Sequence, residues 1–182
     1  NNIQIIKAFD GSLLTEKLVT TVTIDEDGFA ISDQNRDVLK IVVLNRYESG
    51  AKPAIGFING FELKNCAIGS SVAHDSHNIV AIGTQDRFIV EAIELIQKHK
   101  GGLVFVSDKN THILPLPIAG LMSDMEVVKT ADSYETLNKY TTEYGSNMHS
   151  PFMTLAFMSL LVIPHLKLSD KGLFDVDSFS FT

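Results

Sequence analysis

The sequence has little of what several large classes of protein depend on. Cys66 is its single cysteine, so no internal disulfide can form, and no C-x-x-C pair is present to hold zinc. This cysteine usage favours a reducing, cytoplasmic setting. The 15 Lys and Arg residues are scattered and outnumbered by 22 Asp and Glu, which gives a net charge of -7. We therefore expect no basic surface for nucleic acid.

Long apolar runs are missing as well. The longest, Pro151 to Pro164, falls short of the ~20 residues that a membrane span requires, and the N-terminus does not resemble a signal peptide. We expect a soluble chain that makes no membrane contact. With 182 residues and 45% hydrophobic content, residues 1–182 should form a single compact domain. The chain begins without methionine inside a predicted strand, Ile3 to Ile6, which suggests a fragment or a processed chain.

What the chain does contain is a clear alternation of strand and helix patterns. Residues 1–73 read as short strands separated by turns, with Val38 to Leu44 as a buried central strand. A helix should follow Thr84, a plausible N-cap. Its apolar stripe consists of Phe88, Ile89, Ala92, Ile93 and Ile96.

This helix lies between two predicted strands, so Ile79 to Val106 reads as a βαβ unit, and His112 to Leu114 should pair with the second strand as a hairpin. Two more helices are expected, from about Met125 to Tyr144 and over Pro151 to Val162, the latter apolar almost all round. The predicted fold class is α/β or α+β, with a mixed β-sheet, a βαβ unit and several packed helices.

The most chemically loaded segment is the polar loop His74-Asp75-Ser76-His77-Asn78, which interrupts two apolar runs. His74 and His77 could chelate a metal with Asp75, since they are three residues apart. The same side chains could act in acid-base catalysis, as histidine oriented by a carboxylate moves protons near neutral pH. A third interpretation is a structural turn, because Asp, Ser and Asn often close turns through backbone hydrogen bonds.

Other motifs are excluded or weaker. Ser76 lacks the G-x-S-x-G surround of a hydrolase nucleophile, and the glycines around Gly56 to Gly60 do not extend to a nucleotide-binding fingerprint. Cys66 lies in an apolar strand and should behave as a small hydrophobe. Ser123 and Asp124 end an irregular Pro- and Gly-containing segment. They are candidates either for capping the next helix or for contacting a substrate.

Three segments together carry a family resemblance: Val72 to Val80 with Gly83-Thr84, Leu116 to Asp124, and Pro151 to Leu155 running on to Leu168 to Val176. They resemble the C-terminal domain of bacterial adenine deaminase, a metal-dependent amidohydrolase, over nearly the whole chain. Residues Lys64 to Ala67 differ slightly from the sequence that is usual for the family at this point. The resemblance implies hydrolysis of adenine to hypoxanthine and ammonia by a metal-activated water held in a (β/α)8 barrel.

The metal ligands implied by this resemblance include a His-x-His pair, which this chain lacks. A barrel of this kind also takes ~250 residues by itself. We therefore expect the barrel, with its manganese, iron or zinc, to lie outside this chain, and assign no metal ligand here. His74, Asp75 and His77 are the catalytic candidates, and Ser76, Asn78, Ser123 and Asp124 the substrate-binding candidates. The expected partners are the N-terminal barrel of the same protein and adenine. The alternative is a purely structural or homo-oligomerisation domain.

Overall fold

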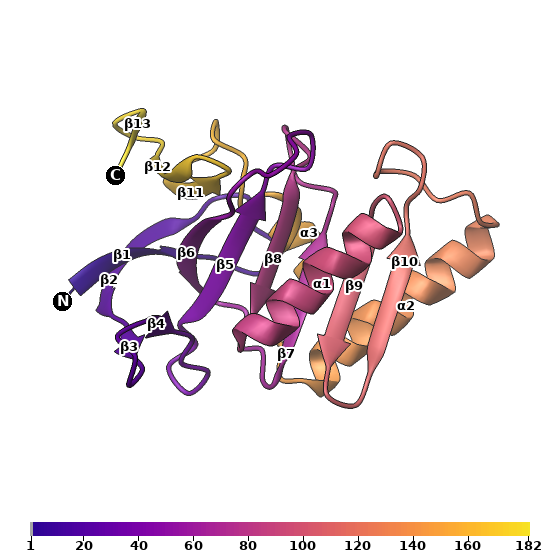
Figure 1. Cartoon of the computed structure of the whole chain (residues 1–182), viewed down its shortest axis with the longest axis horizontal. Helices are drawn as coiled ribbons and strands as arrows, with labels where there is room; N and C mark the ends of the chain where they lie inside the picture. The colour runs from indigo at the N-terminus through magenta and orange to yellow at the C-terminus, as the bar shows by residue number, and fades with distance from the viewer. Residues whose placement is uncertain (1) are drawn as a thin grey trace.

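A central mixed β-sheet organises the chain (Figure 1). The computed structural model describes residues 2–182, and within them eight strands form this sheet in the order β10-β9-β7-β8-β5-β6-β1-β2. The strands are β1 (Asn2–Lys7), β2 (Glu16–Thr21), β5 (Leu39–Leu44), β6 (Ala54–Asn59), β7 (Cys66–Ser70), β8 (Ile79–Gly83), β9 (Gly102–Ser107) and β10 (Thr111–Pro115). The expected buried strand over Val38 to Leu44 and the hairpin at His112 to Leu114 are confirmed as β5 and as the β9–β10 pair.

In the segment expected to form a βαβ unit, Ile79 to Val106, the two strands lie in one sheet with another strand between them. Strands β8 and β9 follow one another on either side of helix α1 (Asp86–Lys98), but both pair antiparallel with β7, which lies between them. Strands β8 and β9 therefore run parallel to each other without being neighbours, because β8 pairs with β5 on one side and with β7 on the other. Among the strand pairs of this sheet within residues 2–182, β1 and β6 run parallel and the others run antiparallel.

Helix α1 covers one face of the sheet with the apolar stripe that the sequence indicated. Phe88, Ile89, Ala92 and Ile96 are buried, against residues of β7, β8 and β9. The expected N-cap is wrong, since Gln85 occupies that position without a side-chain bond. The Thr84 hydroxyl instead accepts the N–H of Cys66 at 3.0 Å and donates to its carbonyl at 3.1 Å. It thus joins the ends of β7 and β8.

Two helices lie on the opposite face, behind the sheet in Figure 1. Helix α2 (Val127–Glu143) agrees with the expected span, and it covers β9 and β10. Its N-cap is Glu126, so neither Ser123 nor Asp124 caps it; the Ser123 hydroxyl accepts the N–H of Met125 at 3.1 Å. No helix within residues 2–182 is long and apolar enough to cross a membrane.

The apolar helix expected over Pro151 to Val162 is shorter than predicted, because α3 (Pro151–Ala156) ends after six residues. Phe152, Leu155 and Met158 are buried in the core shared with β5, β7 and β8. The chain turns after Ala156 and the carbonyl of Met158 accepts the N–H of Leu168 in the next strand. The domain's own core therefore accounts for the apolar character of this run.

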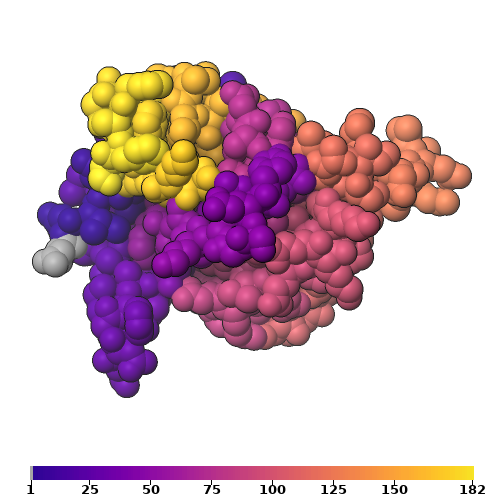
Figure 2. All heavy atoms as spheres, turned by 45° about the horizontal axis from the view of Figure 1, so that its top comes forward, coloured from indigo at the N-terminus to yellow at the C-terminus, as the bar shows by residue number. Residues whose placement is uncertain are grey.

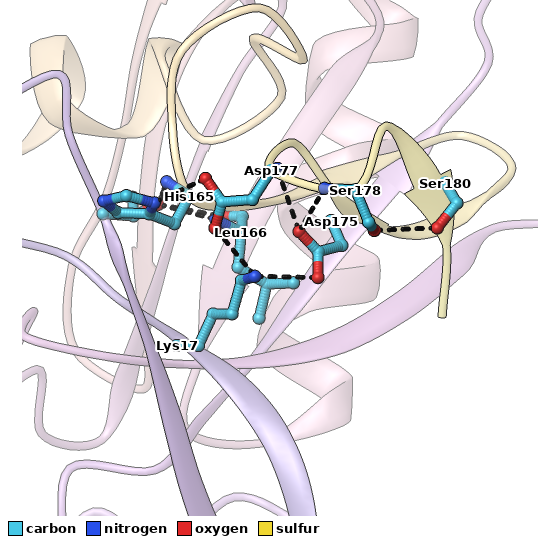
Figure 3. A network of polar contacts seen from close by, with 8 residues as sticks. Lys17, His165, Leu166, Asp175, Asp177, Ser178 and Ser180 are labelled. Atoms are coloured by element: carbon cyan, nitrogen blue, oxygen red, sulfur yellow. Dashed lines mark hydrogen bonds and ion pairs between the residues drawn. The ribbon is translucent and has the colours of Figure 1, made fainter.

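A second, small sheet of β11 (Leu166–Ser169), β12 (Gly172–Asp175) and β13 (Ser180–Phe181) covers the same face over β5 and β6. A polar network joins it to β2 (Figure 3). Lys17 Nζ lies 2.7 Å from the Asp175 carboxylate and 2.8 Å from that of Asp177, which also bonds His165 Nδ1 at 2.7 Å. The Thr15 hydroxyl donates to the carbonyl of Leu166 at 2.8 Å.

Two projections leave the body of the molecule (Figure 2). One is the hairpin of β3 (Thr23–Ile24) and β4 (Ala30–Ile31), and the other is the start of α2 with the segment before it. Between α1 and strands β5 and β6 lies an apolar groove of about 390 Å³, lined by Val42, Leu44, Ile55, Val90 and Ile93 among others.

Candidate functional site

The polar loop His74 to Asn78 lies at one edge of the main sheet, at the top in Figure 1. Strands β5, β7 and β10 end at this edge, so the loops 45–53, 71–78 and 116–126 all leave the sheet there. The N–H of His77 donates to the Ala73 carbonyl at 2.6 Å and closes a tight turn. The N–H of His74 donates to the carbonyl of Ala156, at the end of α3, at 2.8 Å.

The two loop histidines lie together and are partly buried. The His74 ring stacks on Phe157 with centroids 4.8 Å apart, and meets the edge of the His77 ring at 5.5 Å. His77 has a φ of 52°, in the left-handed region, which turns the chain before β8. The two imidazoles therefore pack against each other, and His74 packs against Phe157 as well.

Burial also sets the charge of His77. Desolvation, followed by the neighbouring His74 and the Arg46 cation, lowers the pKa of His77 below its usual value, while Asp75 acts in the opposite direction. The ring should therefore be neutral at physiological pH. Its Nδ1 and the Oδ1 of the buried Asn78 have no hydrogen-bond partner within the part of the chain that the structure describes.

Asp75 and Ser76 are the exposed members of the loop. The structure thus divides the predicted site residues into two groups. Asp75 and Ser76 present a carboxylate and a hydroxyl outward, whereas His74, His77 and Asn78 lie beneath them as partly or fully buried support.

Two residues that the sequence analysis missed hold this loop, Arg46 and Tyr47, which follow β5. Arg46 Nε donates to the His77 carbonyl at 2.6 Å, and Tyr47 donates its hydroxyl to the Ser76 carbonyl at 3.1 Å. Arg46 also stands over the Tyr47 ring, 4.8 Å from its centroid. Their position directly after a buried strand was the signal available in the sequence, since such positions form a loop at the sheet edge.

Arg46 links the loop to a second predicted segment. Its Nη2 donates to the Ala119 carbonyl at 2.7 Å, and the Ser71 hydroxyl donates to the Gly120 carbonyl at 2.6 Å. Gly120 has a φ of 74°, and a Cβ there would lie 2.5 Å from Arg46 Nη1. Glycine is therefore required for the guanidinium to reach this segment.

Ser123 and Asp124 belong to that segment but lie outside the cluster. Ser123 is partly buried and its hydroxyl is bonded to Met125, while Asp124 is exposed. Among the hydrogen bonds of residues 2–182, none joins either side chain to the loop 71–78. The structure brings together the five loop residues with Arg46 and Tyr47, and does not add these two.

The side chains of this edge do not suit a metal ion. Across the described residues there is no group of three His, Cys, Asp or Glu side chains that could hold one. The His74 ring is turned onto Phe157, and the Nδ1 of His77 is buried. The arrangement can donate and accept hydrogen bonds through Asp75, Ser76 and a neutral imidazole, but it does not supply a ligand set.

Comparison with known proteins gives one consistent match. Residues 12–180 match the family model described as adenine deaminase C-terminal domain. Curated proteins named adenine deaminase are 46% identical in Methanothermobacter thermautotrophicus over 97% of this chain, and 49% identical in Salinibacter ruber over all of it. A third, from Methanosarcina acetivorans, is 50% identical over 98% of the chain. The chain spans about a third of the length of these relatives.

Proposed function

The chain belongs to the adenine deaminase C-terminal domain family, and on this basis we propose that it is the C-terminal part of an enzyme that hydrolyses adenine to hypoxanthine and ammonia. The relatives that carry this name are about three times as long. The remaining length is enough for the (β/α)8 barrel that the resemblance implies. In this proposal the barrel holds the divalent metal, manganese, iron or zinc, that activates water, and this chain supplies no ligand to it.

The role proposed for this domain is to present Asp75 and Ser76 at the mouth of the barrel. The observation that carries it is that the loop is held from both sides, by Arg46 and Tyr47 on its backbone and by Phe157 under His74. A solvent-facing turn does not require this support, whereas a group that must meet a substrate does.

The chemistry available to each residue follows from its burial. The Asp75 carboxylate can accept hydrogen bonds from the N–H groups of adenine, and the Ser76 hydroxyl can donate to or accept from its ring edge. Neutral His77 could accept a proton through Nε2, as its Nδ1 is buried. His74 acts as a positioning residue, because its ring is stacked between Phe157 and His77. Asn78, beneath the loop, would contact substrate only through movement of the turn.

The test is steady-state kinetics of the full-length enzyme carrying Asp75→Ala or His74→Ala. Each variant should lower kcat/KM for adenine by at least roughly tenfold, the low end for a positioned polar group. Asp132→Ala, an exposed carboxylate on α2, is the matched control and should leave kcat/KM unchanged. Wild-type kinetics in both loop variants would reject the proposed role.

A second candidate is a domain that serves only assembly, with no contact to substrate. The apolar groove between α1 and strands β5 and β6 favours it, because a lining of this kind gains from being covered. Val90→Asp, at the groove wall, should then reduce the mass of the enzyme in light scattering while turnover per folded molecule stays the same. An unchanged mass argues against this candidate.

A further inference from the structure

Tyr47 is a large aromatic residue that remains 67% exposed, and yet its orientation is fixed. Its hydroxyl donates to the Ser76 carbonyl and accepts from Arg46 Nη2, both at 3.1 Å. Its backbone N–H donates to the Asn45 side chain at 3.0 Å. Fixing an exposed ring costs side-chain rotamer entropy, and here that cost is not offset by burial of the ring's apolar surface. The contacts hold the ring in place while leaving it open.

One face of the Tyr47 ring is already taken by Arg46. The guanidinium carbon lies 4.8 Å from the ring centroid, and its nitrogens are held by the carbonyls of His77 and Ala119. Within residues 2–182 no carboxylate lies within ion-pairing distance of Arg46, so the ring and the backbone carbonyls are its partners. Since a fixed cation covers one face, the exposed area of the ring is on the other face and the edges.

We propose that the open face of Tyr47 is a stacking platform for the purine ring of adenine, beside Asp75 and Ser76 at the mouth of the active site. This inference rests on the proposed function. The hydroxyl bond to Ser76 places the end of the ring against the loop, so a flat heterocycle lying on Tyr47 has the exposed loop side chains at its edge. Stacking on an aromatic face suits purines, and the edge contacts of Asp75 give direction.

A platform binds the ground state and the transition state of the ring about equally, so its loss should appear in KM rather than in kcat. In the full-length enzyme, Tyr47→Leu should raise KM for adenine at least roughly fivefold, the low end for losing one stacked base, and this rise should exceed the accompanying change in kcat. The dissociation constant of the product hypoxanthine, measured by calorimetry, should rise by the same factor.

Tyr47→Phe separates stacking from a structural role of the hydroxyl. It keeps the ring and its stacking face but removes the two hydroxyl bonds that hold the ring, so its KM should rise clearly less than that of Tyr47→Leu. Phe29→Leu, at an equally exposed aromatic in the turn between β3 and β4, is the matched control and should change nothing. An unchanged KM in Tyr47→Leu, or an equal rise in Tyr47→Phe, overturns the platform.

The two proposals fail separately. If Asp75→Ala lowers kcat/KM for adenine while Tyr47→Leu has a wild-type KM, the proposed role of the loop stands and the stacking platform is rejected. A raised KM in Tyr47→Leu with wild-type kinetics in Asp75→Ala and His74→Ala does the reverse. If the wild-type enzyme does not deaminate adenine but binds hypoxanthine, and Tyr47→Leu weakens that binding, the proposed reaction is rejected and purine stacking on Tyr47 is retained.

Discussion

The ring of His74 stacks on Phe157, with centroids 4.8 Å apart and an interplanar angle of 24°. In the sequence the two residues belong to separate features, His74 to the polar loop and Phe157 to an apolar segment. Their contact makes the residue after α3 a support of the polar loop. A substitution at Phe157 therefore tests the support of the loop.

This contact predicts that Phe157→Ala and His74→Ala act through one structural unit. Removing the half-buried Phe157 ring should cost about 1–3 kcal/mol in the free energy of unfolding, less than a fully buried ring. The two substitutions should also lower kcat/KM by similar factors, and the double variant should lose little more than either alone. Additive losses in a double-mutant cycle would show that the stack does not orient His74.

The isolated chain should not deaminate adenine, even with added manganese, iron or zinc. Metal-activated water requires about three or more convergent ligands, and the described residues contain no such group. The assay is hypoxanthine formation by the purified chain with each metal, beside a version extended through the N-terminal barrel, with circular dichroism to confirm folding. Metal-dependent turnover by the short chain would falsify the division of labour and restore the loop as a metal site.

Two histidines should titrate on opposite sides of the usual value of about 6.5. Burial, with the nearby His74 and Arg46, lowers the pKa of His77, whereas the hydrogen bond with Asp10 raises the pKa of His149. NMR titration should therefore show His77 losing its proton at lower pH than His149. Arg46→Met should raise the midpoint of His77, and Asp10→Asn should lower that of His149. A reversed order of the two midpoints contradicts the described burial.

Lys167 should make stability depend on pH in the alkaline range. Its side chain is fully buried on β11 with the Leu13 carbonyl as partner, and burial lowers the pKa of Lys167 to about 8. Between about pH 8 and pH 10 the unfolded chain binds more protons, so the free energy of unfolding should rise with pH, by on the order of 3 kcal/mol.

Lys167→Met isolates this effect, because it keeps most of the side-chain volume and removes the amine. Its stability should be flatter between pH 7.5 and 10, as measured by urea unfolding, and at neutral pH it should equal or exceed that of wild type. Parallel stability curves for the two proteins would mean that the Lys167 amine is charged and solvated in the folded state.

At this edge of the sheet, features formed by neighbouring residues could be predicted from the sequence, whereas contacts between distant residues could not. The polarity of His74 to Asn78 is local, so the loop could be located without a structure. Its supports could not, because Arg46 precedes His77 by 31 residues and Ala119 lies a further 42 residues on. Nothing in the pattern around Tyr47 distinguishes a fixed exposed ring from a mobile one.

The fold shows the same division. The stripe on α1 and the hairpin β9–β10 arise from neighbouring residues and were predicted. The placement of β7 between β8 and β9, and the early end of α3 where Met158 meets Leu168, are set by contacts between distant segments. A hydroxyl at Thr84 looks like a helix cap in sequence, but pairing with Cys66 across 18 residues uses it instead.

The bonds from Thr15 and Lys17 to the C-terminal strands also set an order of events during synthesis. Thr15 bonds Leu166 and Lys17 bonds Asp175, and in each pair the ribosome adds the second residue more than 150 residues after the first. At about 5–20 residues per second, β1 and β2 stay without this cover for about 8 to 30 seconds. Nascent chains of this domain therefore pass through an extended period in which an apolar sheet face is open to chaperones or to neighbouring chains.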